Sequence, residues 1–167
     1  MHRSFALPML LAFALAAPLG AVAAGGTAEG KLTVDGKAFS LTHAYAILFK
    51  NEGVESYRLI LVDVALTDHQ QRLFPDIMVK EIKAGKVHGM GIGIKKSGEI
   101  SSMDIYNSEG WPEVQEPNKK IQLKTSDNKT LAGRAYVDKP FRYVDGLMYQ
   151  YDVKFSTPVR PESDFPL

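Results

Sequence analysis

The amino-acid sequence predicts a mainly β protein, either an antiparallel β-sandwich or a small β-barrel, with one inserted α-helix at about residues 67–84. Apolar and polar residues alternate with period two through most of the chain, which is typical of strands with one buried face. Turn residues such as Asp35-Gly36 divide these segments into about seven to nine short strands. The pattern does not reveal which strands pair, so the sandwich and the barrel stay open alternatives.

The first 24 residues have the pattern of a secretory signal peptide. Arg3 precedes an apolar run from Phe5 to Ala17, and small residues follow around Ala21-Val22-Ala23. We expect cleavage after Ala23 or Ala24, which leaves residues 25–167 as a single mainly β domain in the bacterial periplasm or secreted. The rival interpretation is an uncleaved membrane anchor, but proline and glycine residues interrupt the apolar run.

Composition excludes several classes of site and partner. The chain has no cysteine, so lipid attachment, disulfides and thiolate chemistry are excluded. Without Arg3, the 20 Lys and Arg residues become 19, which equals the 19 Asp and Glu residues. A neutral chain lacks the concentrated positive charge that nucleic acid and anionic membranes attract. We expect neither as the main partner, and no stable membrane insertion after signal cleavage.

The N-terminal half begins with three expected strands. Residues 31–35 turn at Asp35-Gly36 into residues 37–49, a long alternating segment. Residues 57–66 are apolar enough for a central strand that is covered on both faces, and they are expected to pair with residues 37–49 as a hairpin. One face of the long segment carries the large side chains Phe39, Leu41, His43, Tyr45, Ile47 and Phe49.

The expected helix follows these strands. Thr67 and Gln70 have the spacing of a capping box, and Pro75 is suited to restart a helical turn. Ile77, Met78 and Ile82 would form the apolar stripe, and Gly85 is a typical C-terminal stop. Residues 86–95 then alternate as a strand with glycine at every second position. We expect the helix to pack on this bare glycine face.

The C-terminal half continues the strand pattern. Further strands are expected at residues 100–106, 121–125, 131–137, 141–144 and 147–155. The longest irregular stretch, residues 107–120, contains the only tryptophan, Trp111. The tail from residue 157 carries three prolines and is expected to end the fold in an extended conformation.

The sharpest chemical hypothesis is a metal site. His88 and Met90 form an H-x-M pair on one strand face, and imidazole with thioether sulfur suits copper, especially Cu(I). Met103, Met148 or His43 would have to complete the coordination. The competing interpretation is that Met90 simply fills the core. No cofactor is otherwise expected, and no residue can be assigned a catalytic role because hydrolase, phosphate-loop and dinucleotide motifs are missing.

Three other residues are candidates for ligand binding. His43 and Tyr45 are polar residues on an otherwise apolar strand face and would line the interior of a barrel. Trp111 lies in the long loop, where an exposed aromatic side chain is a strong anchor for a partner. Each also has a structural interpretation, as a hydrogen-bonded core residue or as the anchor of the loop.

These observations favour an exported, non-enzymatic β-domain that binds a protein or a small ligand in the cell envelope. The first alternative is a periplasmic copper-binding protein that uses His88 and Met90. The second is a small secreted hydrolase whose site is assembled only by the fold. The identity of the partner and the oligomeric state do not follow from the sequence.

Overall fold

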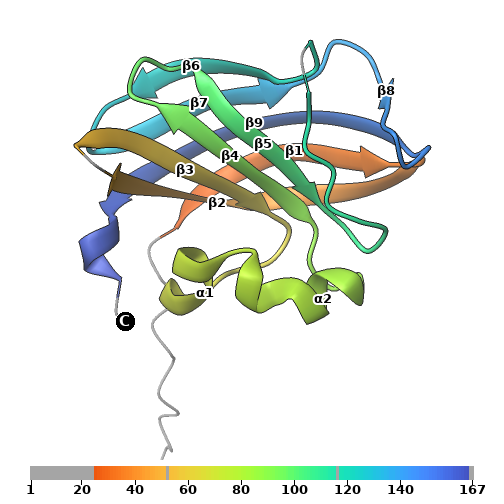
Figure 1. Cartoon of the computed structure of the whole chain (residues 1–167), viewed down its shortest axis with the longest axis horizontal. Coiled ribbons are helices and arrows are strands. Elements are labelled where there is room, and N and C mark those ends of the chain that lie inside the picture. Colours follow the sequence, from red (N-terminus) through yellow and green to blue (C-terminus); the bar gives the residue numbers. More distant parts are fainter. Residues whose placement is uncertain (1–24, 52, 116, 166–167) are drawn as a thin grey trace, which may run out of the picture.

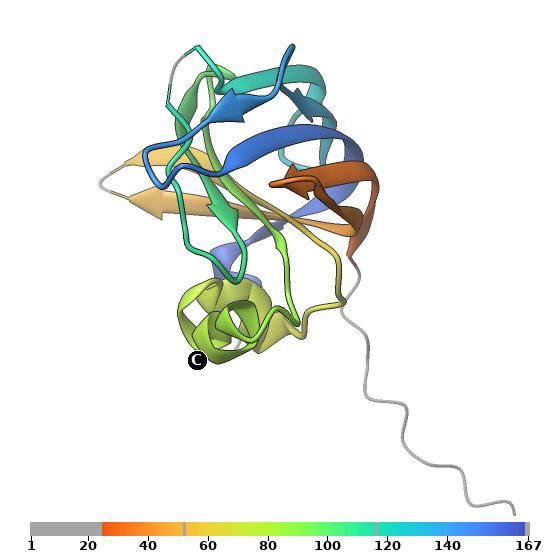
Figure 2. The same cartoon turned by 90° about the vertical axis from the view of Figure 1, so that its right-hand side faces the viewer.

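The computed structural model describes residues 25–51, 53–115 and 117–165 and is a mainly β protein (Figure 1). Its largely antiparallel sheet curls into a half-barrel, with a short helical segment at one end (Figures 1 and 2). The described strands follow the order β5-β4-β3-β2-β1-β9-β7-β6, and β8 pairs with β9. The prediction of an antiparallel β fold with an inserted helix is therefore confirmed. The predicted signal peptide lies outside the described residues and stays a prediction.

The strands of this sheet match most of the expected segments. They are β1 (Gly26–Val34), β2 (Lys37–Asn51), β3 (Val54–Val62), β4 (Gly89–Lys95), β5 (Ile100–Tyr106), β6 (Lys120–Ser126), β7 (Thr130–Tyr136), β8 (Phe141–Arg142) and β9 (Met148–Pro161). Strand β9 extends beyond the expected end because Thr157 and Val159 are buried, and residues 159–161 pair in parallel with β2. The proline-containing tail is thus partly a strand.

The long strand β2 changes face in its middle, which corrects the expected single apolar face. Leu41 and Ala44 both lie in the main core inside the half-barrel, whereas Tyr45 belongs to a second cluster on the outer face. The register between β1 and β2 shifts beside this point, between Thr27 and Gly30. Such a bulge bends a strand and redirects the side chains that follow.

The irregular stretch after β5 seals the open side of the half-barrel. Its residues 112–114 run along β5, where the Ile105 N–H donates to the Pro112 carbonyl over 3.0 Å and the Val114 N–H donates to the Met103 carbonyl over 2.7 Å. Val114 is fully buried in the main core, and the Tyr151 hydroxyl donates to the Asn118 carbonyl over 2.5 Å. The stretch therefore replaces the strand that would pair with the edge of β5 in a closed barrel.

The helical segment consists of α1 (Asp68–Leu73), η1 (Asp76–Met78) and α2 (Val79–Lys83) rather than one helix, because Pro75 has no N–H to continue the helical hydrogen bonds. The expected capping box is present between Thr67 and Gln70. Gly85 ends the segment with a φ of 65°. None of the described helices is long and apolar enough to span a membrane.

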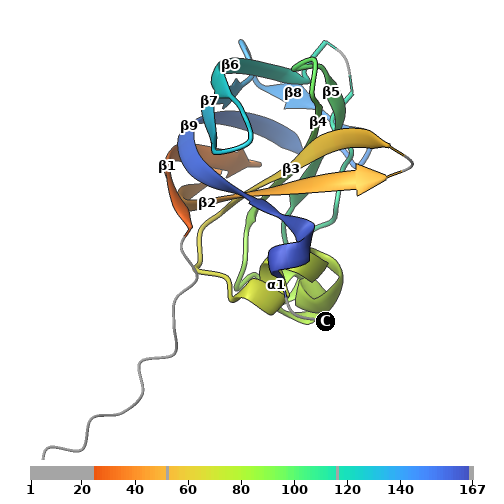
Figure 3. The ribbon, with the colours of Figure 1, turned by 90° about the vertical axis from the view of Figure 1, so that its left-hand side faces the viewer.

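The helical segment packs on the outer face of the sheet, below β3 and β4 in Figure 3. Phe74, Met78 and Ile82 form the second cluster together with Ile60, Val62 and Tyr106 of the sheet. Ile77, which was expected in the apolar stripe, is instead 39% exposed. The break at Pro75 changes the rotation of the following turn, so the stripe is not continuous.

The sealing role of residues 112–114 can be tested with two valines. Val114→Ala should lower the free energy of unfolding by about 2 kcal/mol, because it leaves a cavity in the core. The control is Val144→Ala, since Val144 is 92% exposed and surface substitutions change stability by about 0.5 kcal/mol or less. Urea unfolding monitored by circular dichroism gives both values. Equal effects would show that the stretch is not part of the core.

Candidate functional site

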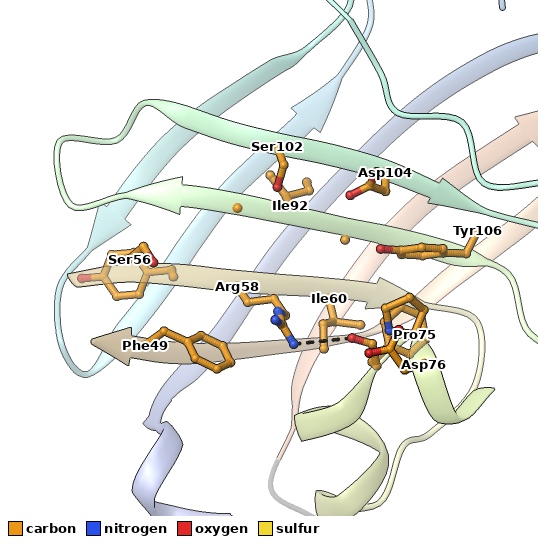
Figure 4. Close-up of a pocket in the computed structure, with 14 residues that line it drawn as sticks. Phe49, Ser56, Arg58, Ile60, Pro75, Asp76, Ile92, Ser102, Asp104 and Tyr106 are labelled. Atoms are coloured by element: carbon orange, nitrogen blue, oxygen red, sulfur yellow. Dashed lines mark hydrogen bonds between the residues drawn. The ribbon is translucent and has the colours of Figure 1, made fainter. Parts of the chain in front are cut away.

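The most complete candidate site is a trough on the outer face of the sheet (Figure 4). Its floor is the backbone of β4 at Gly91 and Gly93, and its walls are the outward side chains of β3 and β5. In register, Gly93 lies between Arg58 and Ser102, and Gly91 lies between Ile60 and Asp104. Neighbouring strands are about 4.8 Å apart, so the two wall strands are about 10 Å apart. We call this 450 Å³ pocket the glycine trough.

Tyr106, and not the helical segment, covers part of the glycine face. A Cβ atom at Gly91 would lie 2.8 Å from the Tyr106 hydroxyl, so the tyrosine ring requires glycine there. The helical segment packs beside Gly89 and Gly91, whose strand partners Val62 and Ile60 belong to the second cluster. The expectation that the helix covers the glycine face is therefore right at one end, and Gly93 remains open to the trough.

Arg58 supplies a cation to one wall of the glycine trough. Its Nη1 donates two long hydrogen bonds to the Arg72 and Phe74 carbonyls, at 3.3 and 3.5 Å, and its guanidinium carbon lies 4.6 Å from the centre of the Phe49 ring. Arg58 forms no ion pair with any residue in the described part of the chain. A guanidinium with unused donors suits a planar acceptor such as a carboxylate.

Asp104 supplies an anion to the opposite wall. It lies directly across from Glu113 in an isolated antiparallel bridge, an arrangement that brings two like charges together. Burial and the charge of Glu113 raise the pKa of Asp104, and Lys119 only partly opposes this. Among the residues that the structure describes, neither carboxylate forms an ion pair. The protein therefore keeps an uncompensated carboxylate in the trough.

The trough also contains hydroxyl groups. The Tyr106 residue is 7% exposed, and its hydroxyl lies over Gly91 in the lining of the trough. Burial, together with the nearby Asp104, raises its pKa, so the hydroxyl is a neutral donor. Ser56 and Ser102 add two further hydroxyls to the lining. These hydroxyls can donate hydrogen bonds to a polar ligand or accept them from it.

His88 and Met90, the predicted copper site, have separate surroundings. Asp63 accepts hydrogen bonds from the His88 Nδ1, at 2.8 Å, and from its backbone N–H, at 2.9 Å. The His88 ring stacks on Phe39 with 3.6 Å between centroids, while Met90 lies fully buried in the main core. The described residues contain no group of three or more His, Asp or Glu side chains that could hold a metal. The copper hypothesis stays a prediction.

The His88–Asp63 pair ties the end of β3 to the start of β4 across the helical segment. When Asp63 accepts from Nδ1, the other ring nitrogen of neutral His88 is a proton acceptor. This is the orientation that a general base needs, but no described residue is a hydrogen-bonded nucleophile beside it. The hydrolase hypothesis also stays a prediction.

The other predicted ligand-binding residues lie outside the lining of the glycine trough. The Tyr45 hydroxyl accepts a 2.9 Å hydrogen bond from the Leu66 N–H, so this buried tyrosine anchors the entry to the helical segment. His43 is half-buried, and its Nδ1 lies 2.9 Å from the Thr42 hydroxyl. Trp111 is 39% exposed and contacts Tyr106 edge-on at 5.9 Å, so it supports the trough from behind.

Arg58, Asp104 and Tyr106 were not identified from the sequence. Arg58 is a charged residue in the mainly apolar strand β3, and Asp104 is the one charged residue of β5, the next strand but one. These two charged residues in apolar strands, with alternating glycines in the strand between them, were the sequence pattern from which the trough could have been predicted. The prediction would also have required knowing that the three strands are neighbours in the sheet. No known protein family, curated protein or solved structure matches the chain.

Asp104 is expected to reduce stability. Asp104→Asn removes one of two facing like charges and should raise the free energy of unfolding by about 0.5 kcal/mol at neutral pH. Because the folded-state pKa of Asp104 is raised, the wild-type group gains its proton first in the folded state, and wild-type stability rises as the pH falls through that pKa. The advantage of the variant should therefore shrink toward acidic pH.

Urea unfolding at several pH values measures this difference. Asp127→Asn serves as the control with the opposite sign, because hydrogen bonds from the Lys129 and Thr130 N–H groups lower the pKa of Asp127. That variant should lose stability at neutral pH. A loss of stability in Asp104→Asn at neutral pH would contradict the assignment of Asp104 as an uncompensated carboxylate.

Proposed function

We propose that the protein is an exported, non-enzymatic β-domain that binds a small polar ligand in the glycine trough. The observation that carries the proposal is the pair of opposite charges in the lining, Arg58 and Asp104, neither of which has an ion-pair partner among the described residues. Preformed concave sites with a few convergent polar groups are the usual form of small-ligand sites, and 450 Å³ lies in their range.

The rigidity of the trough supports the same proposal. Its two walls and floor are neighbouring strands of one sheet, and the inner faces of these strands pack in the main core through residues such as Leu59, Ile92 and Ile105. A binding site on strands loses little conformational freedom when a ligand enters. The polar groups therefore stay in place whether or not the trough is filled.

Charge supports binding of a polar molecule rather than a purely apolar one. Phe49, Ile60 and Phe74 contribute apolar surface, but Arg58 and Asp104 place charges of both signs on the opposing walls. An apolar ligand would cover these groups without satisfying them, which costs free energy. A ligand with both donors and acceptors avoids that cost.

The test is a binding screen by ¹H–¹⁵N correlation spectroscopy with a mixture of amino acids, sugars, nucleosides and organic acids. A ligand should shift the amide signals of β3, β4 and β5. Gly93→Val should abolish the response by filling the trough. The fold should be retained because the two tight contacts of a Cβ atom there are the side-chain hydroxyls of Ser101 and Ser102, which can rotate away, and the Ser102 backbone nitrogen lies at 3.5 Å.

The matched control is Ala38→Val, an exposed position on β2 outside the trough, which should leave the response unchanged. Shifts confined to the surface around Trp111, or shifts that Gly93→Val leaves intact, would place the ligand elsewhere. Either result would overturn the proposed function.

A further inference from the structure

We propose that the ligand of the glycine trough is a small zwitterion with separated charges, of the size of an ω-amino acid or a dipeptide. Its carboxylate would bind Arg58, and its ammonium group would bind Asp104. The inference rests on the proposed function and deepens it by naming the chemical class of the ligand.

The carboxylate end of the ligand would bind at Arg58. Arg58 has no carboxylate partner in the described part of the chain, and its two hydrogen bonds to backbone carbonyls both use Nη1. Phe49 covers the guanidinium from one side at 4.6 Å, which orients the plane. The remaining N–H groups can form the paired hydrogen bonds that arginine makes with carboxylates.

The ammonium end of the ligand would bind at Asp104. Asp104 and Glu113 face each other with no cation in ion-pair contact among the described residues, although Lys119 lies near enough to lower the pKa of Asp104 slightly. An ammonium group would relieve their repulsion and use hydrogen-bond acceptors that the protein leaves open. A dianionic ligand such as a phosphate ester would instead meet Asp76 and Asp104 in the same lining.

Arg58 and Asp104 lie on opposite walls of the trough. Arg58 and Asp104 lie on β3 and β5, with β4 between them, and their register partners on β4 are two residues apart. Figure 4 shows Arg58 directed toward Pro75, where its hydrogen bonds to the α1 end hold it, and Asp104 on the far wall. A ligand that reaches both therefore carries its charges several bonds apart.

Neutral sugars are another class of small polar ligand, because they present many hydroxyls. Sugar rings gain much of their binding energy by stacking their apolar face on an aromatic ring. In the trough the Phe49 ring is covered by Arg58, and Tyr106 lies over Gly91 with its edges against Phe74 and Trp111. The trough offers charges of both signs instead, which a zwitterion matches.

The test titrates the purified chain with γ-aminobutyrate and diglycine, and with butylamine, butyrate and glucose as single-charge and neutral probes. The amide shifts of β3, β4 and β5 report binding. Each zwitterion should bind at least about tenfold more tightly than butylamine or butyrate, since each end adds a charge-assisted hydrogen bond. Arg58→Gln should reduce γ-aminobutyrate to the affinity of butylamine, and Asp104→Asn should reduce it to that of butyrate.

The remaining outcomes separate the inference from the proposed function. Butylamine or butyrate binding as tightly as γ-aminobutyrate, or glucose binding in the trough while the charged probes do not, would overturn the zwitterion and leave the proposed function standing. The absence of trough shifts with every probe and with the screening mixture would overturn both. A fall of the γ-aminobutyrate affinity to that of the single-charge probes in both variants, with unchanged spectra for the rest of the sheet, would support the inference.

Discussion

The trough on the outer face of the sheet depends on β4, which has large apolar residues on its inner face and glycines on its outer face. On its inner face Met90, Ile92 and Ile94 are fully buried in the main core and hold the strand between β3 and β5. On its outer face the alternating glycines offer no side chains, so Tyr106 lies directly over Gly91 and backbone forms the floor of the trough. Arg58 and Asp104 therefore stand as walls over bare backbone. A side chain larger than hydrogen at Gly91 would displace Tyr106 and close this space.

The irregular stretch after β5 joins the sealing of the half-barrel to the formation of the trough. Val114 completes the core, and its neighbour Glu113 places a second carboxylate opposite Asp104. Trp111, from the same stretch, supports the edge of Tyr106. One segment thus closes the open side of the fold and sets the electrostatics of the trough, so changes to its packing affect both.

Sequence patterns correctly predicted the structural elements that depend only on residues close together in the chain. The period-two alternation, the capping box at Thr67 and the stop at Gly85 all depend on residues a few positions apart. The face change in β2 was missed because it depends on a bulge in β1, and the break at Pro75 divided the expected helix. The trough needs three adjacent strands and a bridge from a loop, which no single segment encodes. Its residues therefore could not be grouped before the strand order was known.

Strand β9 has consequences for the way the chain folds. It pairs with β1, β7 and β8 and also with the far half of β2, so residues distant in sequence, such as Thr27 and Ser156, become neighbours. Closing such a long loop is entropically costly and makes folding slow relative to proteins with local contacts. Until β9 has paired, its neighbours β1 and β7 are edge strands with unpaired backbone hydrogen-bonding groups. The partly folded chain can then associate with other copies through these edges.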